Sequence, residues 1–186
     1  MAQTNTGVDV TGNQDNQWTY AYSGALGSGS GNAFLVDPTP GAWPAPSSSF
    51  WIGVTGSGSL PGGTGDNVQR VSYDFSTAFT GTGSSQLMTV WTDNFLTGYT
   101  FNGTLYTIDP LAPSPGDFSQ PAPRNITLVP TGGSNTLTLH FTGDGLTDGI
   151  NVGFTTTPEP ASLALLATGL LGLGGVVARR RRTQQG

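Results

Sequence analysis

Hydrophobic and polar side chains alternate along much of the first 157 residues. Val71, Tyr73 and Phe75 fall on one side of an extended chain, and polar residues separate them. Because successive side chains of a strand point to opposite faces, this pattern predicts a strand with one buried face. The same alternation, or a short apolar run, occurs at residues 18–23, 50–54, 99–101, 105–108, 126–129, 137–141 and 150–154.

Three other segments complete the expected fold. Gln86–Thr92 is apolar at nearly every position, which predicts a central strand covered on both faces. Gly24–Asn32, nearly all Gly and Ser, and Asp37–Ser49, with four prolines, predict long loops. No segment before residue 157 has a helical period. About eight or nine short strands therefore predict an all-β fold, an antiparallel β-sandwich that is jelly-roll-like.

Composition bears on whether the chain folds at all. Disorder is the alternative explanation for 29 Gly among 186 residues. Four Trp, five Tyr and nine Phe residues, however, supply the apolar surface that disordered chains lack. We therefore expect a folded core, with Trp43 and Trp51 packed into it rather than stacked on a ligand.

Charge and cysteine content exclude several classes of function. Residues 1–157 contain ten Asp against Arg70 and Arg124, a formal net charge of −8. Such a surface repels phosphate backbones, so we expect no nucleic-acid partner. The absence of Cys removes disulfides, thiolate nucleophiles and Cys-based metal sites.

The C-terminal end has the properties of a membrane span. Ala161–Ala178 contains no charged residue, and as a helix it would be roughly 27 Å long, close to a bilayer core of about 30 Å. The alternative is a buried helix, but apolar residues surround the segment on all sides. We predict a single C-terminal transmembrane helix, stopped by Arg179, Arg180, Arg181 and Arg182. The positive-inside rule keeps these arginines cytoplasmic and leaves residues 1–157 outside the inner membrane.

Pro158, Glu159 and Pro160 stand immediately before this apolar span. The ordered series of Pro-Glu-Pro, apolar span and arginine run resembles the PEP-CTERM sorting signal, which is also named after the C-terminal domain of ice-binding proteins. The resemblance implies that an exosortase-type membrane enzyme recognises Pro158, Glu159 and Pro160 as a processing signal. It also implies anchoring in the inner membrane, removal of the tail and delivery to the cell surface or the medium. A stiff spacer is the alternative role of Pro-Glu-Pro.

These boundaries divide the chain into three parts. Residues 1–157 form a predicted β-sandwich ectodomain, with long loops in 1–67 and the jelly-roll-like part in 68–154. Residues 158–182 form the sorting and anchor tail, and 183–186 a polar end. Residues 1–5 are polar and lack the features of an export leader, so we expect that a leader was removed or that the start is mis-assigned.

Four short signatures follow one another in the predicted ectodomain: Tyr73-Asp74-Phe75, Trp91-Thr92-Asp93-Asn94, Phe101-Asn102-Gly103 and Asn135-Thr136-Leu137-Thr138-Leu139. In this order they are similar to the galactose-binding type of jelly roll. The resemblance implies weak carbohydrate binding, with Asp93, Asn94 and Asn102 as candidate ligand-binding residues. We expect no cofactor. Jelly rolls often carry a structural calcium, however, so calcium binding is left open.

Candidate catalytic residues are few. His140 is the single histidine, and the strand pattern predicts that it is a solvated strand residue. With one His and no Cys, the usual triads and zinc sites lack their parts, and we predict no catalytic or metal-binding residue. Two carboxylates could serve a glycosidase, and Asp93, Asp109 and Asp117 are available, although a surface-turn role is favoured for each.

The aspartates Asp144 and Asp148 belong to a segment that partly resembles an EF-hand loop, but its third-position ligand is missing. We expect a turn there. The function that follows is a non-catalytic surface or extracellular-matrix protein, associated with exopolysaccharide. The alternatives are a lectin-like carbohydrate-binding module and, third, a carboxylate glycosidase.

Overall fold

The structure, a computed structural model, describes residues 5–37, 40, 43, 48–66, 68–81, 83–108 and 123–156. Within these residues the regular secondary structure is entirely β-strand, which confirms the predicted all-β class. The strands are β1 (Val10–Thr11), β2 (Gln14–Gly24), β3 (Gly27–Leu35), β4 (Ile52–Gly53), β5 (Val71–Thr80), β6 (Gln86–Asp93), β7 (Phe95–Phe101), β8 (Thr104–Thr107), β9 (Arg124–Leu128), β10 (Ser134–Gly143) and β11 (Gly149–Thr156).

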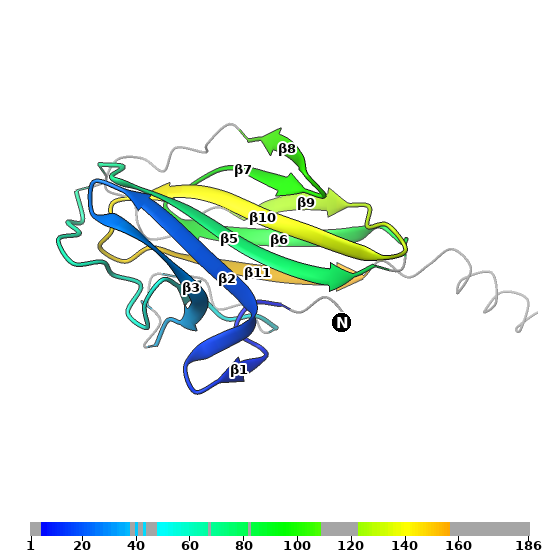
Figure 1. Ribbon diagram of the computed structural model, residues 1–186, viewed down its shortest axis with the longest axis horizontal. Coiled ribbons are helices and arrows are strands. Elements are labelled where there is room, and N and C mark those ends of the chain that lie inside the picture. The colour runs from blue at the N-terminus through cyan, green and yellow to red at the C-terminus, as the bar shows by residue number, and fades with distance from the viewer. Residues whose placement is uncertain are drawn as a thin grey trace, which may run out of the picture. The chain divides into compact units, whose positions relative to one another are not determined.

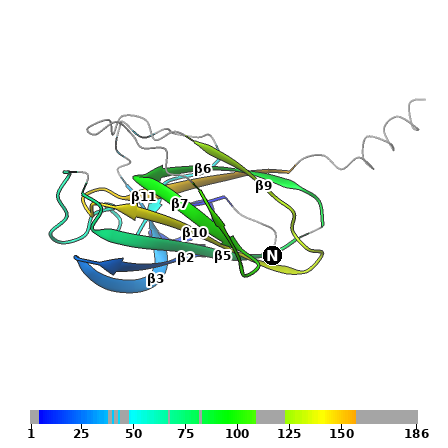
Figure 2. The ribbon, with the colours of Figure 1, turned by 90° about the horizontal axis from the view of Figure 1, so that it is seen from above.

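The strands join into one curled sheet, a half-barrel (Figure 1). Its order is β8-β7-β10-β5-β2-β3-β4-β11-β6-β9, and β1 pairs with β2 outside this path. The pairs between β5, β10, β7 and β2 are antiparallel, as predicted. The curl brings β6, β9 and β11 opposite β5 and β10, so that two layers enclose the core (Figure 2).

The core explains the alternation of the sequence. On β5 the side chains of Val71, Tyr73 and Phe75 are buried, and the residues between them lie on the outer face. Phe141 of β10 is the register partner of Tyr73, and the centroids of their rings lie 4.7 Å apart. Burying a side chain of this size contributes about 1.5–3 kcal/mol to folding. The opposite layer supplies Met88, Val90, Ile126, Leu128, Ile150 and Val152 to the same cluster.

The predicted loop at Gly24–Asn32 is wrong, because most of it belongs to β3, which pairs with β2. Its Gly and Ser residues give no hydrophobic period, but they allow a neighbouring ring to approach the backbone. A Cβ added at Gly29 would stand 2.7 Å from Cε1 of Tyr22, the residue paired with it. The glycine therefore marks close contact in a strand rather than a loop.

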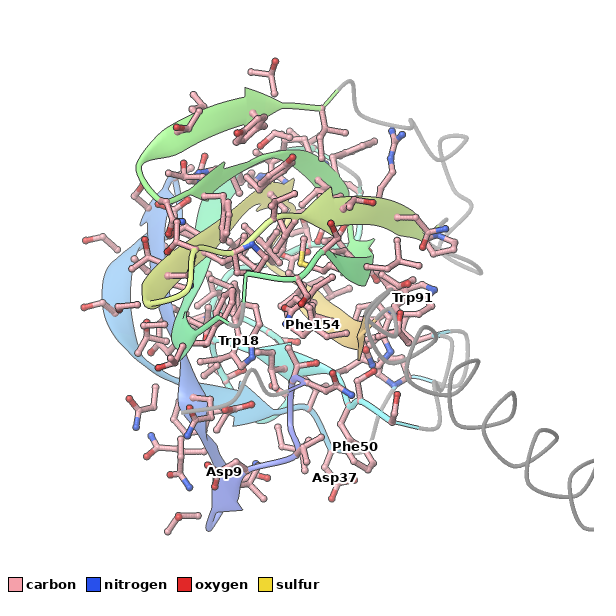
Figure 3. All side chains as sticks on the ribbon, turned by 90° about the vertical axis from the view of Figure 1, so that its right-hand side faces the viewer. Asp9, Trp18, Asp37, Phe50, Trp91 and Phe154 are labelled. Atoms are coloured by element: carbon pink, nitrogen blue, oxygen red, sulfur yellow. The ribbon has the colours of Figure 1, made fainter. Side chains whose placement is uncertain are left out.

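The segment around residue 50 also differs from its predicted pattern. Trp18 is fully buried, whereas Phe50 is 54% exposed and lies on the outside of the body (Figure 3). The strand in this segment is short, since β4 comprises only Ile52–Gly53. Phe50 therefore precedes the strand and does not share its buried face.

Several predicted features lie outside the described residues. They include Asp109 and Asp117, the Pro158–Pro160 signal, the apolar span Ala161–Ala178 and the arginine run. In the described part of the chain, no helix has the length and apolar character that crossing a bilayer requires. The transmembrane helix therefore stays a prediction.

Candidate functional site

Three aspartates are buried near the ends of β6 and β10. Asp93 ends β6, and Asp144 and Asp148 lie in the connection between β10 and β11. Their exposed fractions are 8%, 2% and 2%. The prediction of a surface turn is therefore wrong for Asp93, whereas Asp144 and Asp148 do lie in the expected turn, with their side chains buried. Turn-forming glycines do flank Asp144 and Asp148, but the sequence carries no signal that this connection folds inward.

Asp148 connects three separate parts of the chain. Its Oδ2 accepts hydrogen bonds from the Tyr73 hydroxyl at 2.6 Å and from the Gly145 backbone N–H at 2.7 Å. Its Oδ1 accepts a hydrogen bond from Nδ2 of Asn94 at 2.9 Å, and its own backbone N–H donates to the Gly58 carbonyl. This single carboxyl group thus ties β5, the junction between β6 and β7 and the connection before β11 to one another.

Asp93 is held by an aromatic side chain. Nε1 of Trp43 donates to Asp93 Oδ2 at 2.7 Å, and the centroids of the Trp43 and Trp51 rings lie 4.0 Å apart. Both tryptophans are buried, which confirms that they pack in the interior. The peptide bond between Asp93 and Asn94 is cis. Asp93 and Asn94, both predicted as ligand-binding residues, therefore belong to a buried hydrogen-bonded cluster.

The surroundings change the acidity of this cluster. Burial raises the pKa of Asp93 to about 7, against the hydrogen bond from Trp43, which lowers it. Burial likewise raises the pKa of Asp148 to about 6, and hydrogen bonds from Tyr73 and Gly145 partly oppose the effect. Removing a carboxylate from water disfavours its charged form, and neighbouring carboxylates add repulsion. Burial is also the main reason why the pKa of the Tyr73 hydroxyl is raised.

Two carboxyl groups with different pKa values near neutrality could in principle act as an acid and base pair. Here the described contacts of Asp93 and Asp148 are with groups that belong to the fold: Trp43, Tyr73, Asn94 and Gly145. Each contact joins segments that are distant in sequence or shapes the turn itself. The hydrogen bonds of Asp93 and Asp148 therefore serve to position the loops at this end of the sheet.

A metal ion does not fit this cluster. Calcium takes about six to eight oxygen ligands, mainly from carboxylates and carbonyls. Within the described ranges, no three carboxylate or imidazole side chains are placed so that they could hold a metal ion. Oxygens of Asp93 and Asp148 accept hydrogen bonds instead. The calcium left open by the jelly-roll resemblance has no ligand set there.

Asn102, the third predicted ligand-binding residue, lies elsewhere. It occupies the turn between β7 and β8, with φ of 49°, as the Asn-Gly signature predicts. Its Nδ2 donates to Oδ1 of Asn135 at 2.9 Å, and its Oδ1 accepts a hydrogen bond from the Thr136 backbone N–H. Asn94 precedes β7 and Asn102 follows it, so roughly 20 Å of strand separates them. The structure therefore brings Asp93 and Asn94 together but not Asn102.

A second polar array lies on the outer face of the sheet, and sequence reasoning missed it. Nδ1 of His140 lies 2.6 Å from Oδ1 of Asp74, and its Nε2 lies 2.8 Å from the Thr100 hydroxyl. His140 is therefore hydrogen-bonded at both ring nitrogens and only 26% exposed in its side chain, not simply solvated. Only the register of β5, β10 and β7 brings these residues together.

The order of carboxylate, imidazole and hydroxyl is that of a hydrolase triad. A triad also requires N–H donors directed at the developing oxyanion. Each of β5, β10 and β7 has a neighbouring strand on both sides, so their N–H groups serve the sheet. The Asp74 side chain is 52% exposed. Among the described residues, this array therefore lacks the surroundings of a nucleophilic site.

Comparison with known proteins identifies the C-terminal tail. Residues 156–182 match the family model of the PEP-CTERM protein-sorting motif. This confirms the predicted sorting tail, and the motif implies a protein that is exported, anchored in the membrane and then processed by an exosortase-type enzyme. The match begins at Thr156, the last residue of β11.

The remaining comparisons concern the whole chain. No curated protein matches it. Among solved structures, it is similar to the β-glucosidase from Kluyveromyces marxianus, both in complex with glucose and in a selenomethionine-labelled form. In both cases the identity is 8% and the TM-score 0.43 over 82% of this chain. The match covers 17% and 18% of the β-glucosidase chains, so this chain spans less than a fifth of their length.

Proposed function

We propose that this chain is a non-catalytic protein of the cell surface or extracellular matrix, which associates with exopolysaccharide through its β body. The sorting motif at residues 156–182 carries the proposal, because it begins where the last strand ends. Processing in the Pro158–Pro160 region would release the strands as an intact unit.

The physical route follows from the tail. Ala161–Ala178 spans the inner membrane as a helix, and Arg179–Arg182 stay on the cytoplasmic side, since moving a guanidinium into the bilayer centre costs about 2.5–3.5 kcal/mol. The β body is then held outside the membrane until an exosortase-type enzyme cuts near Pro158–Pro160. The strands themselves take no part in anchoring.

The non-catalytic role is supported by the contacts of the buried carboxylates. Asp93 and Asp148 are hydrogen-bonded to groups that hold the fold together. The outer array of Asp74, His140 and Thr100 lies on strands whose N–H groups serve the sheet. The hydrogen bonds of the buried carboxylates and of the outer array therefore both support a structural role.

Intact mass of the protein recovered from its host tests the sorting step. We expect the form in the envelope or medium to have lost the residues that follow the Pro158–Pro160 region. In a host without the exosortase-type enzyme, the full-length mass should remain in the membrane fraction. Glu159→Ala should have the same effect, whereas Thr183→Ala, a control beyond the arginine run, should be processed normally. Equal mass and location in both hosts would refute the proposal.

Release of reducing ends from acidic and neutral polysaccharides tests the catalytic alternative. We expect no hydrolysis above the buffer blank. Hydrolysis that disappears in Asp93→Asn, while circular dichroism shows an unchanged fold, would establish a carboxylate glycosidase and overturn the non-catalytic role.

A further inference from the structure

The two ends of the curled sheet border a pocket. In the described residues, β8 pairs only with β7 and β9 only with β6, so each has one outer edge without a neighbouring strand (Figure 1). The pocket has a volume of about 380 Å³. We call it the seam pocket. Its walls come from Tyr99, Tyr106, Thr107 and Ile108 on one side and from Arg124 to Thr127 on the other.

Two tyrosines provide the aromatic wall of the seam pocket. Tyr99 of β7 and Tyr106 of β8 are direct register partners. Their ring centroids lie 4.7 Å apart, and the ring planes differ by only 9°. Tyr106 is 43% exposed. A tyrosine offers a flat apolar face with a hydroxyl at its rim, and a sugar ring offers the matching combination of C–H groups on its face and hydroxyls around it.

Besides Ile108, Ile126 and Arg124, the lining includes three short polar residues. Thr107, Asn125 and Thr127 are exposed and carry hydroxyl or amide groups that both donate and accept hydrogen bonds. The outer edges of β8 and β9 add backbone N–H and C=O groups. Such a lining suits a ligand with many hydroxyls. The volume lies near the lower end of the range of about 300–1,000 Å³ for small-molecule sites, which favours a short sugar unit.

Charge narrows the ligand further. Among the residues that the structure describes, those lining the seam pocket include Arg124 and no carboxylate, although residues 1–157 carry ten Asp and only two Arg. The other arginine, Arg70, is bonded to Asp66 through both terminal nitrogens. A guanidinium has five N–H donors in a planar fork that matches a carboxylate, so it can hold one partner and still bind another. The seam pocket therefore favours an anionic ligand, although the rest of the β body is acidic.

We propose that the seam pocket binds a hexuronic acid unit of an acidic polysaccharide. The sugar carboxylate accepts hydrogen bonds from Arg124, the ring lies against Tyr106, and the ring hydroxyls contact Asn125 and Thr127. This inference rests on the polysaccharide association proposed above and deepens it by naming the sugar class and the site. The site differs from Asp93, Asn94 and Asn102, the residues that the sequence favoured.

Titration calorimetry on the full chain tests this inference, with trigalacturonate and its fully methyl-esterified form as probes. The two share rings and hydroxyls and differ in charge. We expect the acid to bind and the ester to bind at least about tenfold more weakly, since charge-assisted hydrogen bonds are the stronger ones. Arg124→Gln should weaken binding of the acid at least about tenfold, whereas Arg70→Gln should leave it unchanged. Tyr106→Ala should weaken it, and Tyr106→Phe should retain it.

Three results would overturn the inference: no binding of trigalacturonate, equal binding of acid and ester, or normal binding by Arg124→Gln. A fourth result would also overturn it: without any sugar, the backbone amides of β8 and β9 become more protected from hydrogen exchange as the protein concentration rises. The seam would then be a strand-pairing interface between two copies. None of these results affects the mass of the processed chain, so failure here is distinguishable from failure of the sorting proposal.

Discussion

Two groups of aspartates in this protein have opposite surroundings. Asp66 is exposed, and a cation four residues further along the chain binds it: Arg70 reaches both carboxylate oxygens, with Nη2 at 2.6 Å from Oδ2. The hydrogen bond from Arg70 is the main reason why the pKa of Asp66 lies well below its ordinary value. Asp93 and Asp148 are buried and bonded to neutral donors, and burial raises the pKa of both.

The difference shows what makes a carboxylate matter for this fold. Asp66 and Arg70 lie four residues apart and are exposed to water. Water could solvate each charged group about as well as its partner does, so the pair contributes little to stability. The bonds of Asp148 reach Asn94, 54 residues away, and Tyr73, 75 residues away. They form only when the sheet has curled. The buried cluster should therefore control stability, and the exposed pair should hardly affect it.

Asp148→Ala should have the largest effect. It leaves the Tyr73 hydroxyl and the Asn94 amide, both buried, without their acceptor and opens a small cavity. We expect the free energy of unfolding to fall by about 4 kcal/mol at pH 5, from the cost of unsatisfied buried donors. Urea unfolding followed by tryptophan fluorescence measures it. A loss no greater than that of Asp66→Ala, the exposed counterpart, would contradict the comparison.

Gly143→Ala provides a second variant that keeps every carboxylate. A Cβ at Gly143 would collide with the Asp148 carboxyl group. The unfolding midpoint should fall, and the bond to Tyr73 should be displaced. If the midpoint were unchanged, Asp148 would be free to move, and its role as a fixed connection would be wrong.

Raising the pH should have the next largest effect on the free energy of unfolding. The carboxyl groups of Asp93 and Asp148, with pKa values of about 7 and 6, bind protons more tightly in the folded than in the unfolded chain. Their contribution to stability is therefore complete below about pH 4 and is lost as the pH rises through 6 and 7. We expect a loss of several kcal/mol between about pH 4 and pH 8, because each unit by which a pKa is raised corresponds to about 1.4 kcal/mol.

Urea unfolding at several pH values checks this slope. Asp93→Asn cannot titrate and should flatten it. Asp66→Asn should keep the slope of the unaltered chain, because Asp66, with its lowered pKa, stays ionised across most of the range. A stability that increases from pH 5 to pH 8 would show that the buried carboxylates are stabilised as anions, contrary to the inference from burial.

The sequence predicted the fold wherever side chains alternate in size and polarity. The strands β5 and β10 followed from this period, because one of their faces lies on the core. The strand β3 was missed, since its Gly and Ser residues serve the approach of Tyr22 and leave no hydrophobic pattern. Alternation of hydrophobic and polar residues indicates a strand only where side chains are buried on one face. It cannot indicate a strand such as β3, which contributes mainly its backbone.

The buried cluster was predictable only in part. Asp93 and Asn94 were singled out as candidate ligand-binding residues, and the structure places them in the buried cluster. Asp148 and Tyr73 were not connected with them, because the order of strands in the sheet decides which segments meet. The array of His140 with Asp74 and Thr100 depends in the same way on the register of three strands. Neither can be inferred from spacing along the chain.

The smallest effect should come from Arg70→Gln, which breaks the exposed pair. Its ion pair with Asp66 lies in water, and the energy gained on pairing is offset by the loss of side-chain freedom. We expect the urea midpoint of Arg70→Gln to equal that of the unaltered chain within error, both in low salt and in 1 M NaCl. At 1 M the Debye length is only about 3 Å, so interactions between surface charges are screened. A midpoint that falls in low salt and recovers in high salt would assign a structural role to the pair. A fall as large as that of Asp148→Ala would mean that a local contact can stabilise this sheet as strongly as one that spans it, and the distinction between the two groups of aspartates would then be lost.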